Sequence, residues 1–265
     1  MRMVVKGLGL LALVGGQVGL SGCYGSAMSL AKCTAKEKRT DSLERDFAPG
    51  STLRVRNDFG PIFITGGSDE GCQIEGRVYV HAPTKREAEE IGEQVQIVAE
   101  PNDGVLLVKV IRPELKENRS AGVDLRIVVP TKANVDCETE FGRIKVDGIE
   151  GDIRVSTQFG AITCDKIVSG SITARTEFGA IYVTCEDASP ADLVADVQTE
   201  YGKIRFRAPE AFDGSFDIGT DFGSTGAKIP IVSNSQWTHD RKVATTGEGK
   251  GRVTLRTEFG SVKLR

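Results

Sequence analysis

The sequence predicts an all-β protein: a parallel β-solenoid (β-helix) of two-strand rungs of about 20 residues, with an N-terminal hairpin and one short helix. Three observations predict this fold. The text TEFGRIKV, which begins at Thr139, returns in near copies along the chain. The glycines of successive copies lie 18, 19, 23, 21 and 37 residues apart. Apolar and polar residues alternate on both sides of each glycine. Periods near twenty are typical of repeats that stack to bury a continuous core.

Each copy predicts a strand, a corner at the glycine and a second strand. Apolar residues stand at odd positions before the glycine and at even positions after it, as Val135 and Ile144 do around Gly142. Side chains alternate with period two along a strand, so the shift marks a corner, where glycine can adopt backbone angles closed to other residues. The corner glycines are Gly60, Gly142, Gly160, Gly179, Gly202, Gly223 and Gly260.

Residues at two further positions of the repeat are expected to point into the core. The Phe or Tyr directly before each glycine is expected to fill the corner, and the Thr three residues before it to form an internal hydroxyl ladder. A β-sandwich is the competing architecture. Near-identical copies at a nearly constant period favour the solenoid.

The first residues predict export from the cytoplasm. Arg2 and Lys6 are followed by an apolar run and then by the tetrapeptide LSGC, which ends at Cys23. This layout is typical of a secretory signal. Small residues directly before a cysteine resemble the bacterial lipoprotein signal, which implies lipid on the Cys23 thiol and cleavage just before it. A plain secretory signal with an incidental cysteine is the alternative.

These signals predict three segments. Residues 1–22 are the expected signal peptide, residues 23–49 a lipid-anchored polar stalk, and residues 50–265 one folded domain. The protein is therefore expected to cross the inner membrane and to stay lipid-anchored in the cell envelope. Tyr24 stands where an Asp would favour retention at the inner membrane in the enterobacterial sorting rule, so the outer membrane is expected.

The expected domain has two parts. Residues 50–131 should contain a helix at 84–96, where Ala88, Ile91 and Val95 fall at helical spacing after a proline, and a hairpin around the turn text PNDG. Residues 132–265 should form the regular rungs.

Composition narrows the classes of function. Asp and Glu number 37 and Lys and Arg 34, so no basic excess points to nucleic acid. Two histidines and the absence of a C-x-x-C spacing argue against a structural zinc site, and no cofactor or metal is expected. With Cys23 assigned to lipid, an odd number of cysteines remains, and their pairing stays open: Cys33, Cys72, Cys137, Cys164 and Cys185.

One outward column of the repeat is polar. Two residues before each glycine, the copies carry a candidate acidic ladder, interrupted by Gln158: Asp58, Glu140, Glu177, Glu200, Asp221 and Glu258. Like charges one strand apart repel, so something must compensate them. Neighbouring cations and solvent provide the simpler explanation. Binding of a divalent cation, or of cationic groups on an envelope polymer or peptide, is the functional alternative.

The chain resembles the bacterial putative adhesin family from about Ser51 to Arg265. The resemblance is carried by the opening STLRVRNDFGPIFITG, the central text VVPTKANVDCETEFGRIKVDGIEGDIRV and the closing GRVTLRTEFGSVKLR. Membership implies an envelope β-solenoid related to the head domain of some autotransporter adhesins, in several cases on a lipoprotein. The family brings no catalytic residues to transfer.

The expected function is a non-enzymatic, membrane-anchored binding, adhesion or scaffold module whose partner is an envelope polysaccharide or another envelope protein. An envelope-stress sensor is one alternative, and a polysaccharide-acting β-helix enzyme is a weaker one. The acidic column is a ladder and not a pair of acids in contrasting surroundings, which disfavours acid–base catalysis. Trp237 and His239 are expected in an exposed loop.

Overall fold

The computed structural model describes residues 35–68, 70–228 and 233–265, all within one compact unit that spans Lys32–Arg265. The predicted signal peptide, Cys23 and Cys33 lie outside the described residues. For the described residues, the prediction of an all-β protein with one helix is confirmed. In the described part of the chain, no helix is long and apolar enough to span a membrane.

The helix and the strands follow one another in this order: β1 (Ala35–Arg45), β2 (Thr52–Phe59), β3 (Ile62–Ser68), β4 (Cys72–Ala82), α1 (Lys85–Gln94), β5 (Gln96–Asn102), β6 (Val105–Ile111), β7 (Ser120–Pro130), β8 (Asn134–Phe141), β9 (Ile144–Asp147), β10 (Ile153–Phe159), β11 (Ile162–Ile167), β12 (Ser171–Phe178), β13 (Ile181–Cys185), β14 (Val194–Tyr201), β15 (Ile204–Arg207), β16 (Gly214–Ala227), β17 (Ser233–Trp237), β18 (Arg241–Thr245) and β19 (Gly251–Leu264).

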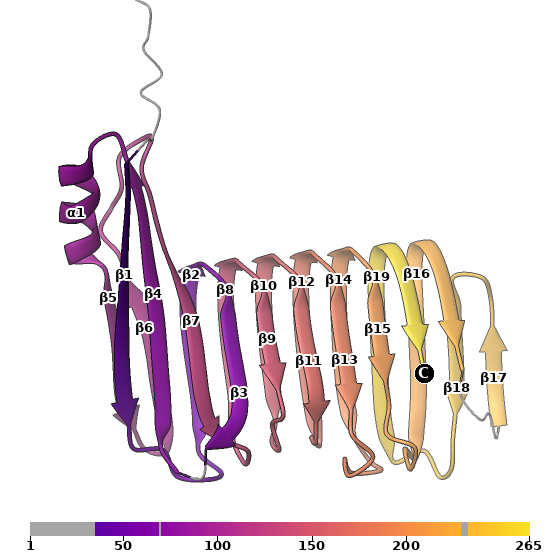
Figure 1. Ribbon diagram of the computed structural model, residues 1–265. Coiled ribbons are helices and arrows are strands. Elements are labelled where there is room, and N and C mark those ends of the chain that lie inside the picture. Colours follow the sequence, from indigo (N-terminus) through magenta and orange to yellow (C-terminus); the bar gives the residue numbers. More distant parts are fainter. Residues whose placement is uncertain (1–34, 69, 229–232) are drawn as a thin grey trace, which may run out of the picture. The chain divides into compact units, whose positions relative to one another are not determined.

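The predicted parallel β-solenoid is wrong for the sheet as a whole. The described strands form one mixed sheet of 19 strands, which wraps around the core into a nearly closed barrel. Its middle is parallel, but β4–β7, β1–β4 and β5–β6 pair antiparallel at one end, and β16–β18 and β17–β18 at the other (Figure 1). Short connections favour antiparallel neighbours, as between β5 and β6 and between β17 and β18.

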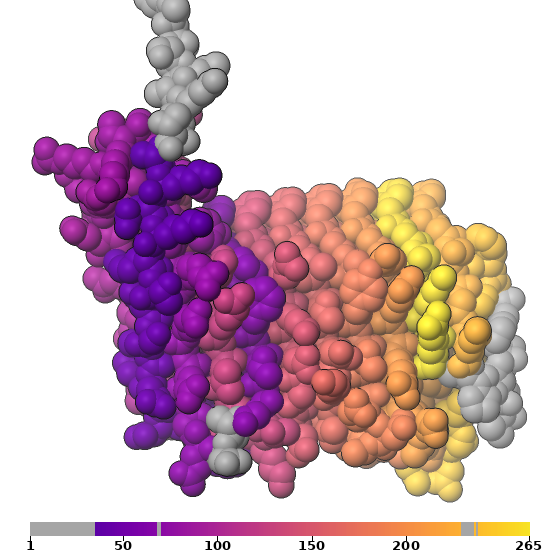
Figure 2. All heavy atoms as spheres, viewed as in Figure 1, coloured from indigo at the N-terminus to yellow at the C-terminus, as the bar shows by residue number. Residues whose placement is uncertain are grey.

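In the parallel section, neighbouring copies of the repeat lie in register. Thr157 pairs with Thr139 on β8 and with Thr176 on β12, and Ile162 pairs with Ile144 on β9 and Ile181 on β13. The two ladders meet at the corner glycines and send their apolar residues into one shared core. The copies form successive bands across the surface shown in Figure 2.

The predicted stalk is wrong for residues 35–45, which form β1 and pair with β4 along its length. One side chain of β1 also caps the C-terminus of α1. Arg39 donates to the backbone carbonyls of Gly92 and Val95 at 2.8 Å, and to Asp41. A cation at a helix C-terminus satisfies carbonyls that lack an intrahelical partner and complements the helix dipole. β1 is thereby held against both the sheet and α1.

The last strand of the chain lies inside the sheet. β19 pairs in parallel with β14 and β15 on one side and with β16 on the other. β19 is therefore not an edge strand, although it is the last strand in the sequence. The 37-residue interval before Gly260 contains the β17–β18 hairpin, in which β18 pairs with β16. After this hairpin, β19 inserts between β14 and β16, two strands that precede it in the sequence.

The four described cysteines, Cys72, Cys137, Cys164 and Cys185, are buried free thiols. A pairing of Cys164 with Cys185 is thus not formed. Burial raises the pKa of Cys72, Cys164 and Cys185 to about 12, and that of Cys137 also rises. These thiols therefore remain protonated and serve as small apolar groups in the core.

Candidate functional site

The corner glycines are required by space. A Cβ built on Gly160 would lie 2.1 Å from the carbonyl oxygen of Gly142, and one on Gly179 would lie 2.0 Å from that of Gly160. The corners thus stack backbone on backbone. Most of them do not use a backbone angle restricted to glycine, since only Gly60 and Gly260 among the seven have positive φ. The sequence identifies the right residues, but the physical reason is close approach.

The conserved spacing of threonine to glycine locks each corner to its neighbour. The buried hydroxyls of Thr157, Thr176 and Thr199 donate to the carbonyls of Gly142, Gly160 and Gly179 at 3.0–3.1 Å. Five of the corner glycines, from Gly60 to Gly202, also donate their N–H to the carbonyl of an aromatic residue on the neighbouring copy, for example at 3.0 Å between Gly160 and Phe178. The threonines therefore bond to backbone and do not form the expected hydroxyl ladder.

The aromatic residues before the glycines point outward, which contradicts the expectation that they fill the corner. They form a continuous stack with centroids 4.8–5.0 Å apart and ring planes within 13° of parallel. Rings inside the stack are 41–44% exposed, and Phe222 at its end is 67% exposed. This aromatic stack consists of Phe59, Phe141, Phe159, Phe178, Tyr201, Phe259 and Phe222.

A shallow acidic groove of about 560 Å³ runs across the outer face of β8, β10, β12, β14, β19 and β16. Its walls carry five residues of the predicted ladder: Glu140, Glu177, Glu200, Asp221 and Glu258. The sixth, Asp58, lies outside the groove and pairs with Arg112 at 2.8 Å. Each of these carboxylate residues directly precedes an exposed residue of the aromatic stack in the sequence.

The groove carboxylates lack the expected compensating cations. Within 4.0 Å, none of the five forms an ion pair with another described residue. The two arginines of the groove are engaged elsewhere, Arg175 with Asp196 and Arg256 with Asp217. Two further cations of the same repeats, Lys203 and Arg205, lie over the ring of Tyr182. Six carboxylates and two arginines line the groove, so its net charge is negative.

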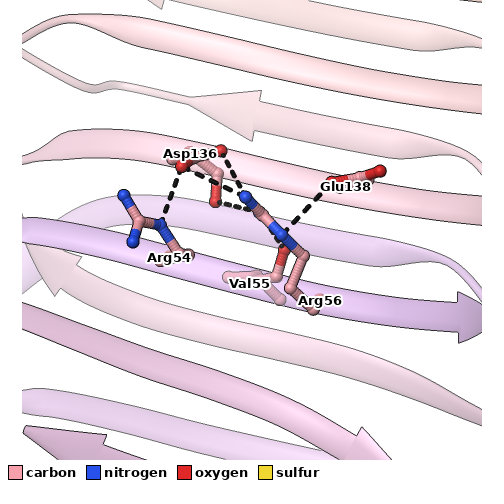
Figure 3. A network of polar contacts seen from close by, with 5 residues as sticks. All are labelled: Arg54, Val55, Arg56, Asp136 and Glu138. Carbon is pink, nitrogen blue, oxygen red and sulfur yellow. Dashed lines mark hydrogen bonds and ion pairs between the residues drawn. The ribbon is translucent and has the colours of Figure 1, made fainter.

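The charges beside the groove are paired instead. Arg54 and Arg56 on β2 reach across to β8, where Asp136 accepts from both at 2.8 and 3.1 Å and Glu138 pairs with Arg56 at 3.2 Å (Figure 3). Cation and carboxylate side chains on neighbouring strands thus neutralise one another two and four residues away from the ladder. Asp136 and Glu138 thus belong to a network of ion pairs between strands, whereas the five ladder carboxylates of the groove form no ion pair with a described residue.

Asp217 anchors the far end of the face. It accepts from Arg241 on β18 at 2.9 Å and from Arg256 on β19, and these hydrogen bonds and charges lower the Asp217 pKa to about 2. Because the folded pKa lies below the unfolded value near 3.9, the ionised carboxylate stabilises the fold above pH 4 and loses this effect as pH falls through 2.

We expect Asp217→Asn to lower the free energy of unfolding by about 1 to 2 kcal/mol at pH 7, a value reduced for the partial exposure of the site. The difference from the parent should shrink between pH 4 and pH 2. Urea unfolding at pH 7, 4 and 2 measures it. A deficit that stays constant down to pH 2 would contradict the ion-pair explanation.

The arrangement suits binding of extended cationic groups. No three His, Cys, Asp or Glu side chains in the described ranges converge as metal ligands, so the geometry does not favour the divalent-cation alternative. Ring faces inside the stack are covered by neighbouring rings, which leaves edges and not faces for contact with a sugar. His239 lies exposed in the turn between β17 and β18, in agreement with the expected loop, whereas Trp237 is the last residue of β17. The side chain of Trp237 lies outside the description.

Comparison with known proteins gives distant structural likenesses. No family model matches the chain, and no curated protein matches it. A putative cell adhesion protein from Clostridium sporogenes is 14% identical, with a TM-score of 0.46, over 85% of this chain and 99% of that one. A putative adhesin from Bacteroides fragilis is 10% identical, with a TM-score of 0.44, over 86% and 97%. A putative lipid binding protein from Parabacteroides distasonis is 11% identical, with a TM-score of 0.24, over 88% and 97%. Similarity at this level carries no argument about function, and the fold rests on the strand pairings above.

Proposed function

We propose that the protein is a non-enzymatic binding module of the cell envelope, of the putative adhesin type, and that its acidic groove binds an extended cationic segment of another envelope protein. In this proposal a lipid on Cys23 anchors the chain after secretion across the inner membrane, in the outer membrane. The lipoprotein signal in the sequence supports the anchor.

The observation that carries the binding proposal is the row of five unpaired carboxylates in the groove. Repeated acids in near-equivalent surroundings favour many weak contacts with a cationic chain over proton transfer at one bond. Lysine or arginine side chains can reach these carboxylates, and the exposed rings that follow the carboxylates in the sequence offer apolar surface to the aliphatic stems. The same field accelerates encounter with a positive partner and weakens as salt rises.

The test measures how tightly a fluorescein-labelled peptide of alternating Lys and Ser binds to the full chain. The readout is the fluorescence anisotropy of the peptide, in a buffer that contains EDTA. A groove variant with Glu140→Gln, Glu177→Gln, Glu200→Gln and Glu258→Gln should bind at least about tenfold more weakly, because it loses four screened contacts. Its melting temperature should not fall, since these carboxylates hold no partner within the described part of the protein.

A matched control removes the same charge elsewhere. Glu93, Glu114, Glu117 and Glu210 are exposed, and their four Gln substitutions should leave binding close to that of the parent. If the groove and control variants weakened peptide binding equally, the effect would come from net charge alone, and the proposal would be wrong. Retention of the same proteins from envelope extract by parent and groove variant would have the same meaning.

A further inference from the structure

The two ends of the aromatic stack differ. At one end Phe59 is covered by Arg112, whose guanidinium carbon lies 4.2 Å from the ring centroid. At the other end Phe222 stacks on Phe259 at 4.8 Å, and no ring or cation of the described residues covers its second face. Its 67% exposure, against 42% for Phe259, reflects this open face.

The covered end of the stack, at Phe59, shows which kind of group can bind at a terminal ring. Arg112 lies over Phe59 and donates from Nη2 to Asp58 Oδ2 at 2.8 Å, so one guanidinium meets a ring face and the carboxylate that precedes it in the sequence. The negative face of a ring attracts a cation, and the planar guanidinium both stacks on the ring and bonds to a carboxylate.

The open end repeats the same three residues. Asp221-Phe222-Gly223 on β16 matches Asp58-Phe59-Gly60, and each triplet occupies the corner of its copy. Asp221 is exposed and forms no ion pair with any residue in the described ranges. β18 pairs with β16 as far as Gly219. The turn before β18 then accepts hydrogen bonds from Thr220 and Thr225 on either side of the corner, yet Phe222 itself stays 67% exposed.

We infer that Asp221 and the free face of Phe222 form a binding site for an arginine side chain of a partner protein. The guanidinium would lie over the ring and bond to the Asp221 carboxylate, as Arg112 does within the chain at Phe59 and Asp58. Lysine is a poorer occupant because its ammonium is a strongly hydrated point charge without a planar face. This inference deepens the proposed function, since Asp221 also lines the acidic groove, and it names arginine as the group at the end of the groove.

The test uses NMR titration of the full chain with three capped tripeptides, Gly-Arg-Gly, Gly-Lys-Gly and Gly-citrulline-Gly. The arginine peptide should shift the ring signals of Phe222, which the Phe222→Leu variant identifies. It should bind at least about fivefold more tightly than the lysine and citrulline peptides. Phe222→Leu and Asp221→Asn should each weaken arginine binding at least about fivefold.

Two controls keep the outcome specific. Phe178→Leu changes a ring whose two faces are both covered, and it should leave arginine binding unchanged. The double variant Glu140→Gln, Glu177→Gln changes the far part of the groove and should also preserve the Phe222 shift. Equal binding of citrulline, or arginine binding that does not perturb Phe222, would overturn the inference. Failure of the long Lys-Ser peptide with a preserved Phe222 shift would reject the groove proposal alone.

Discussion

Replacing Gly179 with alanine is expected to lower the free energy of unfolding by about 3 kcal/mol or more, because overpacking against backbone has no flexible group to move. The new Cβ would lie 2.0 Å from the carbonyl oxygen and 2.6 Å from the carbonyl carbon of Gly160. Relief requires the two corners to separate. That movement also strains the hydrogen bonds from Gly160 to Phe178 and from Thr176 to Gly160, each 3.0 Å long.

Gly170 provides the matched control. A Cβ there meets nothing within 4 Å, and its backbone angle is not among the positive values. Gly170→Ala should therefore be neutral or stabilising by about 0.4 to 1 kcal/mol, because alanine narrows the unfolded ensemble. Urea midpoints of both variants, compared with the parent, measure the contrast. Similar midpoints for Gly179→Ala and Gly170→Ala would show that the corners tolerate a side chain and would refute the space argument.

The sequence predicts the parallel middle of the sheet well, since the periodic apolar columns are the buried residues. Val135, Ile144, Ile153 and Ile162 are each at most 2% exposed. The pattern does not predict the ends, because strand direction at the edges depends on which distant segments pair. β1 illustrates this: its text AKEKRTDSLER has few apolar side chains, and it joins the sheet through backbone pairing with β4. β19 illustrates it again, because only tertiary pairing places the last strand between β14 and β16.

The candidate site was predicted in part. The acidic column lies outward, and five of its carboxylates line one groove. Strict alternation places the residue before the glycine inside, yet Phe141 and Phe159 are 41% and 42% exposed. The corner breaks the alternation one residue earlier than the glycine. The signal that could have revealed this is the pairing of an acid with an aromatic in six of the seven copies, since a ring beside a solvated carboxylate is poorly placed for a core.

Asn57 is the one departure from threonine at its position in the seven copies, and its surroundings explain it. The side chain is 2% exposed, and its amide donates to the carbonyls of Gly60 at 3.2 Å and Val123 at 2.9 Å. The hydroxyl of Thr139 on the next strand donates instead to the backbone carbonyl of Asp58, at 3.5 Å, so among the side chains only Asn57 donates to the carbonyl of Gly60 in the described structure. One hydroxyl could not serve both carbonyls, whereas an amide group has two donors.

Asn57→Asp is expected to lower the free energy of unfolding by about 3 to 5 kcal/mol at pH 7, because it replaces two buried donors with an unpaired buried charge. The oxygen already present, Oδ1, has no hydrogen-bond partner in the described structure, so the second oxygen would add a further unsatisfied acceptor facing two carbonyls. Burial and these carbonyls should raise the folded pKa of the new carboxyl above its unfolded value near 3.9.

The sign of the pH dependence follows from that shift. A raised folded pKa means that the folded variant is favoured when the carboxyl is protonated, so its deficit should shrink as pH falls toward 4 and grow as pH rises. Asn57→Thr is the control: it keeps one donor and should cost only about 1 to 2 kcal/mol, with no titration of its own. Urea unfolding of both variants at pH 7 and pH 4 separates the cost of the buried charge from the cost of the lost hydrogen bond. A pH-independent deficit for Asn57→Asp equal to that of Asn57→Thr would mean that the amide's two hydrogen bonds do not hold the first corner to β7, and that packing alone determines this end of the aromatic stack.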